Sequence, residues 1–161
     1  MRAYTPLVIA VVLGGPLVVA AVRQAQTPVS LSATLRAHLQ DEQLQTVTSV
    51  RGFPIGVRDA LQELFGSGSL DIVDVGASVQ SSPVVTRVIR RLVVAGCAVD
   101  HCLVYYEIPG PPQSWRVALF YWTPAATKFE AGGTAPAGLK TIDEVRRALF
   151  SGTITGRPKD W

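Results

Sequence analysis

Residues 87–108 read RVIRRLVVAGCAVDHCLVYYEI, and this stretch decides the fold. Its two apolar arms are rich in Val, Leu and Tyr, which favour strands. The arms flank the short segment 98–101, and a loop of four residues between two strands is typical of a β-hairpin. In such a hairpin Cys97 and Cys102 lie directly opposite each other, within reach of a disulfide. The stretch therefore predicts a hairpin closed by a Cys97–Cys102 bond.

Two further expectations follow from the predicted hairpin and its disulfide. The pairing of the cysteines places Glu107 opposite Leu92 and close to Arg90 on the same face, which predicts a cross-strand ion pair between Glu107 and Arg90. Because the disulfide closes a very small loop, it removes little chain entropy and stabilises the fold by only about 1–2 kcal/mol. We expect its larger effect to be on the register.

The first arm is ambiguous upstream of the hairpin. Residues 84–95 also fit an amphipathic helix, with Ser82 as its cap and Pro83 in its first turn. The high valine content and the partner arm favour a strand from Arg87 onward.

Two more strands are predicted after the first arm: the hairpin's second arm and the segment that follows it. Leu103–Ile108 and Trp115–Trp122 are joined by the proline-rich turn at 109–112 and carry apolar residues on both faces. Strands of this kind belong in the middle of a sheet that is covered on each side. Leu70–Val75 is a further short strand, so the sequence predicts an antiparallel meander of about four strands. Thr123–Lys140 is predicted to be a long loop.

Three helices surround these strands. The first follows Ser30 as its cap, with leucines at every fourth position from Leu31 to Leu39. The second covers 53–65, with Pro54 in its first turn and Gly66 just past its end. The third begins with a capping box at Thr141–Glu144 and stops before Gly152. The prediction is an α+β fold in one domain, residues 26–161: two helices, the meander with its stapled hairpin, and a C-terminal helix.

Residues 1–25 have the layout of a targeting leader. After a positively charged start, the run Leu7–Val22 carries no charged or strongly polar side chain, and the first acidic residue of the chain is Asp41. Small residues follow at Ala20 and Ala21, as at a cleavage site. A helix over this run rises about 24 Å, less than a hydrocarbon core of about 30 Å. A cleaved signal peptide is therefore favoured, and a retained membrane anchor is the alternative.

Composition narrows the class of protein further. The chain of 161 residues has 15 basic and 12 acidic side chains. Without Arg2 and Arg23 of the leader the balance is 13 against 12, so the charge does not indicate a nucleic-acid partner. The absence of asparagine and the excess of arginine over lysine suggest a GC-rich bacterial genome. We expect a periplasmic or secreted protein, or a membrane-anchored extracytoplasmic one, in surroundings where a disulfide persists.

The residues that could bind a metal or a cofactor do not form a known pattern. The one dense cluster of metal-competent side chains is Cys97, Asp100, His101 and Cys102. Its cysteines have neither the spacing of a zinc site nor that of a redox Cys-x-x-Cys pair, and the only other histidine, His38, is predicted to lie on a distant helix. The segment 133–141 resembles a phosphate-binding loop but has one residue too many before its lysine. We therefore predict no metal, no cofactor and no catalytic residue.

What remains is a surplus of aromatic and arginine side chains on neighbouring strands, which suits recognition of a protein or an envelope polymer. The sequence predicts a non-catalytic binding module that uses an aromatic sheet face and the 123–140 loop. The candidate ligand-binding residues are Arg90, Tyr106, Trp115, Arg116 and Trp122.

Two alternatives stay open. The first is an extracytoplasmic enzyme that uses His101 or an unassigned carboxylate. The second is a structural component of an envelope complex, held at the membrane by its leader. The partner, the substrate and the oligomeric state do not follow from the sequence.

Overall fold

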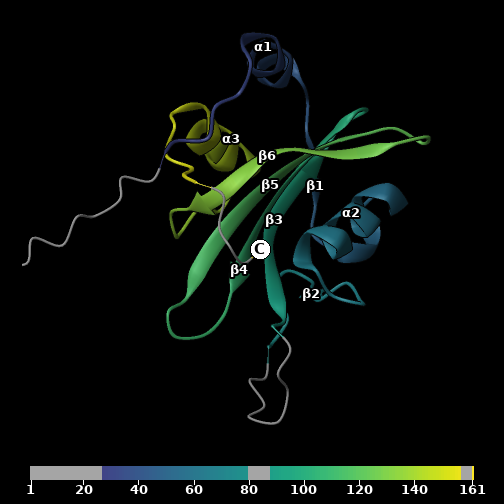
Figure 1. Cartoon of the computed structure of the whole chain (residues 1–161), viewed down its shortest axis with the longest axis vertical. Coiled ribbons are helices and arrows are strands. Elements are labelled where there is room, and N and C mark those ends of the chain that lie inside the picture. Colours follow the sequence, from purple (N-terminus) through teal and green to yellow (C-terminus); the bar gives the residue numbers. More distant parts are fainter. Residues whose placement is uncertain (1–26, 80–87, 157–160) are drawn as a thin grey trace, which may run out of the picture.

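The computed structural model describes residues 27–79, 88–156 and 161 (Figure 1). Within them, three α-helices and a six-stranded sheet form an α+β fold, as predicted. The predicted leader, residues 1–25, and the ambiguous residues 84–87 lie outside the described ranges. The elements are, in chain order, α1 (Ala33–Asp41), β1 (Gln45–Val47), a 3-10 turn η1 (Val50–Gly52), α2 (Ile55–Phe65), β2 (Ile72–Val73), β3 (Arg90–Cys97), β4 (His101–Ile108), β5 (Ser114–Trp122), β6 (Thr127–Ala135) and α3 (Ile142–Phe150).

The sheet has the order β1-β3-β4-β5-β6, and its last four strands are an antiparallel meander. β1 pairs with one end of β3 in the antiparallel sense, and β2 pairs with the other end in the parallel sense. The sheet therefore has six strands where about four were predicted, and β1 and β6 are the strands that the sequence analysis missed.

β6 occupies most of the segment that was predicted to be a loop. Its Gly132 and Gly133 are buried strand residues with neighbouring backbone against them. A Cβ on Gly132 would lie 2.3 Å from the carbonyl oxygen of Val117, and a Cβ on Gly133 would lie 2.4 Å from that of Gly156. These glycines therefore serve close backbone packing in a strand, although glycine pairs more often mark turns.

The β3–β4 hairpin confirms the predicted disulfide. Cys97 is paired with Cys102 in the ladder, with their Cα atoms 4.1 Å apart. The predicted register fails farther along, because the ladder shifts between Leu92 and Val94 and leaves one extra residue in β3. Glu107 consequently lies opposite Arg91 and forms its ion pair with Arg91, not with Arg90.

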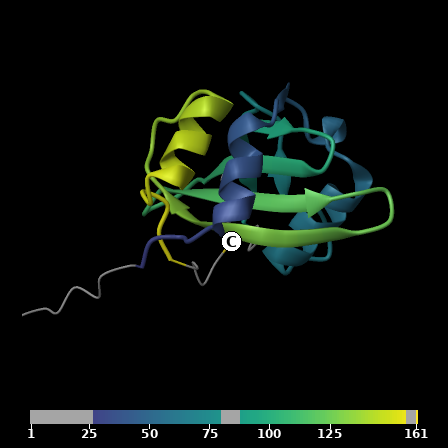
Figure 2. The ribbon, with the colours of Figure 1, turned by 90° about the horizontal axis from the view of Figure 1, so that it is seen from above.

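Both faces of the sheet are covered, as the apolar character of the strands predicts. Figure 1 shows α2 on one side of the sheet and α3 on the other, and Figure 2 shows α1 beside α3. One core cluster joins Leu39 of α1 and Val145 and Leu149 of α3 to the sheet. The second joins Val57 and Leu61 of α2 to the opposite face.

Helix ends follow the sequence signals closely. Gly66 follows α2 in the left-handed conformation, with φ of +62°. Thr141 and Glu144 form the predicted capping box of α3. The cap of α1 is Ser32, not Ser30, and its hydroxyl oxygen accepts a hydrogen bond from the Leu35 amide. No helix in the described ranges combines the length and apolarity needed to cross a membrane.

The placement of His38 differs most from expectation. It was predicted to lie far from the hairpin, yet its ring centroid is 5.0 Å from that of His101. The C-terminal end of α1 therefore lies against the tip of the β3–β4 hairpin.

Candidate binding groove

The predicted binding residues do not share one face of the sheet. Trp115 packs into the core cluster under α1 and α3, whereas Tyr106 and Trp122 belong to the cluster under α2. Successive residues of a strand point to opposite faces of the sheet. Trp115 and Trp122 are seven residues apart, an odd number, so they lie on different faces. The structure thus separates Trp115 from the other candidates.

Arg90 and Tyr106 are buried beneath the C-terminal end of α2. Tyr106 has no exposed surface, and its ring meets that of Phe65 edge-on at 5.4 Å between centroids. The Arg90 guanidinium stacks 3.9 Å from the centroid of the Phe65 ring, and its Nε donates a 2.7 Å hydrogen bond to the main-chain oxygen of Trp161. The half-buried Arg116 pairs with Tyr106 in the ladder and, with Arg90 and Trp161, lines a hollow of about 1050 Å³.

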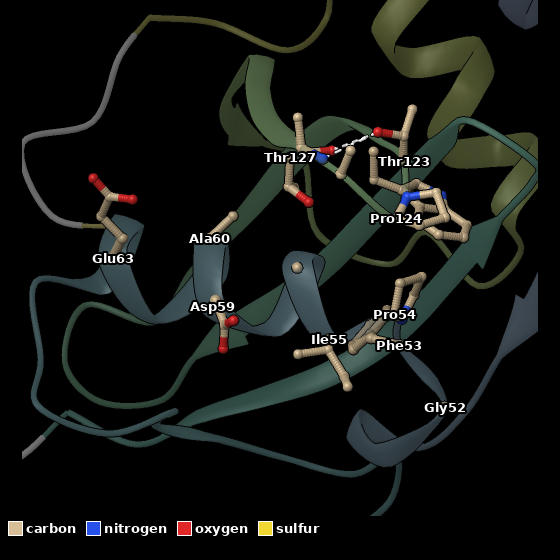
Figure 3. Close-up of a pocket in the computed structure, with 14 residues that line it drawn as sticks. Gly52, Phe53, Pro54, Ile55, Asp59, Ala60, Glu63, Thr123, Pro124 and Thr127 are labelled. Carbon is tan, nitrogen blue, oxygen red and sulfur yellow. Dashed lines mark hydrogen bonds between the residues drawn. The ribbon is translucent and has the colours of Figure 1, made fainter.

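Trp122 lies in a different place, in the wall of a groove of about 890 Å³ beside the start of α2 (Figure 3). The groove runs between α2 and the turn that joins β5 to β6. Figure 3 shows Ile55, Asp59 and Glu63 on the helix side and Pro124 and Thr127 on the turn side. Most of the lining is apolar, and the complete lining is Gly52, Phe53, Pro54, Ile55, Gly56, Asp59, Ala60, Glu63, Trp122, Thr123, Pro124, Ala125, Ala126 and Thr127.

The floor of the groove depends on a close approach of helix and strand. A Cβ on Gly56 would lie 2.1 Å from Oγ1 of Thr127, so a larger residue there would force the Thr127 side chain or the helix to move. The turn is held by reciprocal backbone hydrogen bonds between Thr123 and Ala126. Phe53 is buried at the base of the helix. The groove is therefore shaped by backbone contacts as well as by side chains.

The groove combines an exposed apolar side chain with negative charge. Ile55 is 68% exposed although it is a large aliphatic residue. Asp59 and Glu63 follow it along the exposed surface of α2, and the lining contains no basic residue. The Nε1 atom of Trp122 is buried and has no hydrogen-bond partner among the described residues. A buried donor without a partner is uncommon and calls for a physical explanation.

Sequence reasoning found Trp122 and the turn but missed the helix side of the groove. Two signals were present. Ile55 stands outside the apolar stripe of its helix, which runs through Val57 and Leu61. Gly56 lies within the first turn of the same helix, where glycine lowers helix stability unless a close contact requires it.

Comparison with known proteins found no relative of this chain. No known protein family, curated protein or solved structure matches the chain. Any function must therefore be argued from the geometry of this molecule.

Proposed function

We propose that this chain is an exported, non-catalytic binding module, and that the groove beside α2 binds an apolar, positively charged segment of a partner protein. The main support for this proposal is that one groove contains Ile55 and Trp122 together with two carboxylates and no basic side chain. Apolar surface supplies affinity, and the acidic groups select the sign of the partner's charge.

Several features favour a protein segment as the ligand. An exposed isoleucine gains from burial against aliphatic side chains. Lysine or arginine side chains of such a segment would pair with Asp59 and Glu63, which are exposed and therefore open to a partner.

We favour binding over catalysis because the thiol chemistry that two cysteines could offer is blocked. The two cysteines are joined in a disulfide and offer no thiol nucleophile.

Export is part of the same proposal. A disulfide is typical of oxidising compartments, and the apolar run near the N-terminus has the pattern of a signal peptide. N-terminal sequencing of the protein purified from its host distinguishes a cleaved form from one that keeps its leader as a membrane anchor.

Binding is tested with two synthetic peptides of equal length, one alternating leucine and lysine and the other leucine and glutamate. We expect the lysine peptide to bind at least about tenfold more tightly and to move the indole N–H resonance of Trp122 in the ¹⁵N spectrum. Its affinity falls as salt is raised, because exposed charges are screened.

The variants Asp59→Asn and Glu63→Gln should weaken the lysine peptide, whereas Asp41→Asn, on α1, removes the same charge elsewhere and should leave its affinity unchanged. Equal affinity for both peptides, or equal loss in all three variants, would show that the groove does not select this class of partner.

A further inference from the structure

Two histidines and two carboxylates meet where α1 reaches the hairpin tip. His38 and Glu42 are one turn apart on and just after α1, and Asp100 and His101 are adjacent in the hairpin. One ligand atom from each residue faces the others, and these four atoms all lie within 4.8 Å of one another. The chain has two histidines in all, and both are in this cluster.

The distances match those of a tetrahedral metal site. His38 Nε2 lies 3.2 Å from Asp100 Oδ1 and 3.9 Å from Glu42 Oε2. His101 Nδ1 lies 2.9 Å from the same Asp100 oxygen and 3.4 Å from the same Glu42 oxygen. Ligands at the usual zinc bond lengths of about 2.0–2.2 Å are about 3.3 Å apart along the edges of a tetrahedron. Four of the six distances between the ligand atoms are therefore near the edge length of a tetrahedral zinc site, and the other two do not exceed 4.8 Å.

Glu42 gives a second and independent observation. Its side chain is only 9% exposed, and its buried Oε2 accepts no hydrogen bond within the described residues. A buried carboxylate oxygen without a partner is costly, and a cation among the four groups would satisfy it.

Rigid elements hold each pair of ligands. The main-chain N–H of Trp122 donates to the carbonyl of Asp100, and that of Ala98 donates to the carbonyl of His101, so the hairpin tip is fixed on both sides. The guanidinium of Arg146 on α3 donates to the carbonyl oxygens of Leu39 and Glu42 and fixes the end of α1. The rings of Tyr121 and His101 pack in a T-shaped arrangement, with 5.6 Å between their centroids.

We propose that His38, Glu42, Asp100 and His101 form a zinc site that clips α1 to the tip of the disulfide-closed hairpin. Two imidazoles with two carboxylates suit zinc and related first-row ions, whereas calcium and magnesium take six or more oxygen ligands. All four tetrahedral positions come from the protein, so the ion has a structural role and no open position for a substrate. The inference is independent of the groove on the other face.

The sequence analysis predicted no metal because the cysteine spacing was wrong for zinc and His38 was expected to lie far from His101. Cys97 and Cys102 instead close the loop that presents Asp100 and His101. The remaining ligands come from a helix whose position the sequence did not reveal.

The test uses the full chain without a histidine tag, with its disulfide oxidised and its metals removed by EDTA. Zinc is titrated by calorimetry, and cobalt is titrated as a spectroscopic probe. We expect one zinc ion per chain, no comparable uptake of calcium or magnesium, and the intense visible bands of tetrahedral cobalt. His38→Gln and Asp100→Asn should each weaken zinc binding by more than about 100-fold, since even outer-shell changes cost 10–100-fold.

Asp41→Asn is the matched control, because Asp41 is exposed and lies next to Glu42 outside the cluster. It removes the same charge as Asp100→Asn but no ligand, so its weak electrostatic effect on His38 should lower zinc affinity by no more than about threefold. Absence of zinc binding, an octahedral cobalt spectrum, or equal affinity in Asp41→Asn and His38→Gln would each overturn the proposal. The cobalt spectrum of the unchanged chain decides the geometry even if a variant folds poorly.

Discussion

The helices α1 and α2 are attached to opposite faces of one sheet by different forces. α2 fully buries Val57 and Leu61 and approaches β6 closely at Gly56. α1 buries only Leu39, and its C-terminal end is held by Arg146 and by the histidine and carboxylate cluster. The free energy of packing a helix through apolar side chains hardly depends on ions or protons. The free energy of attaching a helix through charged side chains depends on both. We therefore expect ions and protons to change the attachment of α1 more than that of α2.

The comparison is tested first by removing one buried leucine from each helix. Leu61→Ala leaves a cavity in a fully packed core and should lower the free energy of unfolding by about 3–4 kcal/mol. Leu39→Ala should lower it by only about 1–2 kcal/mol, because α1 can detach while the rest of the fold persists. Urea unfolding of both variants measures the difference, and equal losses would mean that α1 is as integral to the core as α2.

Sequence patterns predicted those parts of the fold that local signals specify. The capping box at Thr141, the glycine stop at Gly66 and the opposed cysteines all report nearby backbone geometry, and each was confirmed. β6 was missed because Gly132 and Gly133 look like turn residues, and their reason for being glycine is backbone from β5 and from the segment after α3. The extra residue between Leu92 and Val94 likewise has no local signal.

The candidate sites were harder to predict than the fold. His38 is separated by 62 residues from Asp100, and no spacing rule links a helix to a hairpin tip at that distance. Trp122 was singled out as an aromatic residue, but its groove also needs the start of α2, which only tertiary packing brings there. Arg90 and Tyr106 looked like surface groups because arginine and tyrosine often are, yet the packing of Phe65 buries both.

Zinc should stabilise the docking of α1 and leave that of α2 unchanged. At a free concentration about 100 times its dissociation constant, an ion that binds only when α1 is docked adds about 2.7 kcal/mol to that docking. Amide hydrogen exchange should therefore slow by about 100-fold in α1. In α2, whose contacts do not involve the ion, exchange through local opening should be unaffected. Equal protection of both helices would break the contrast, because it would mean that α1 opens only when the whole molecule unfolds.

The smallest effect expected is that of pH on the metal-free protein. Burial and the Asp100 carboxylate raise the pKa of Glu42 from 4.5 to about 7, so between these values the folded chain holds more protons than the unfolded chain. Stability must then fall as pH rises through this window. The hydrogen bond with Asp100 raises the pKa of His38, and that contribution is also present below pH 6.5 and lost as pH rises.

Asp100 does not oppose this trend. Burial raises its pKa, but Glu42 and the two imidazoles outweigh burial and lower the pKa to about 2. Its stabilising contribution is therefore lost only in strong acid. Without zinc, we expect α1 to exchange its amides faster at pH 8 than at pH 5, after correction for intrinsic rates, by an amount worth about 1 kcal/mol after solvent screening.

Zinc affinity should change in the opposite direction and rise with pH, because the ligands must lose their protons before they bind the ion. Glu42→Gln should flatten the pH dependence of α1 in the metal-free protein and weaken zinc binding at the same time. Asp41→Asn should do neither to a comparable extent. A pH dependence that survives in Glu42→Gln would place its origin outside the cluster, and α1 would then be docked as independently of protons as α2 is.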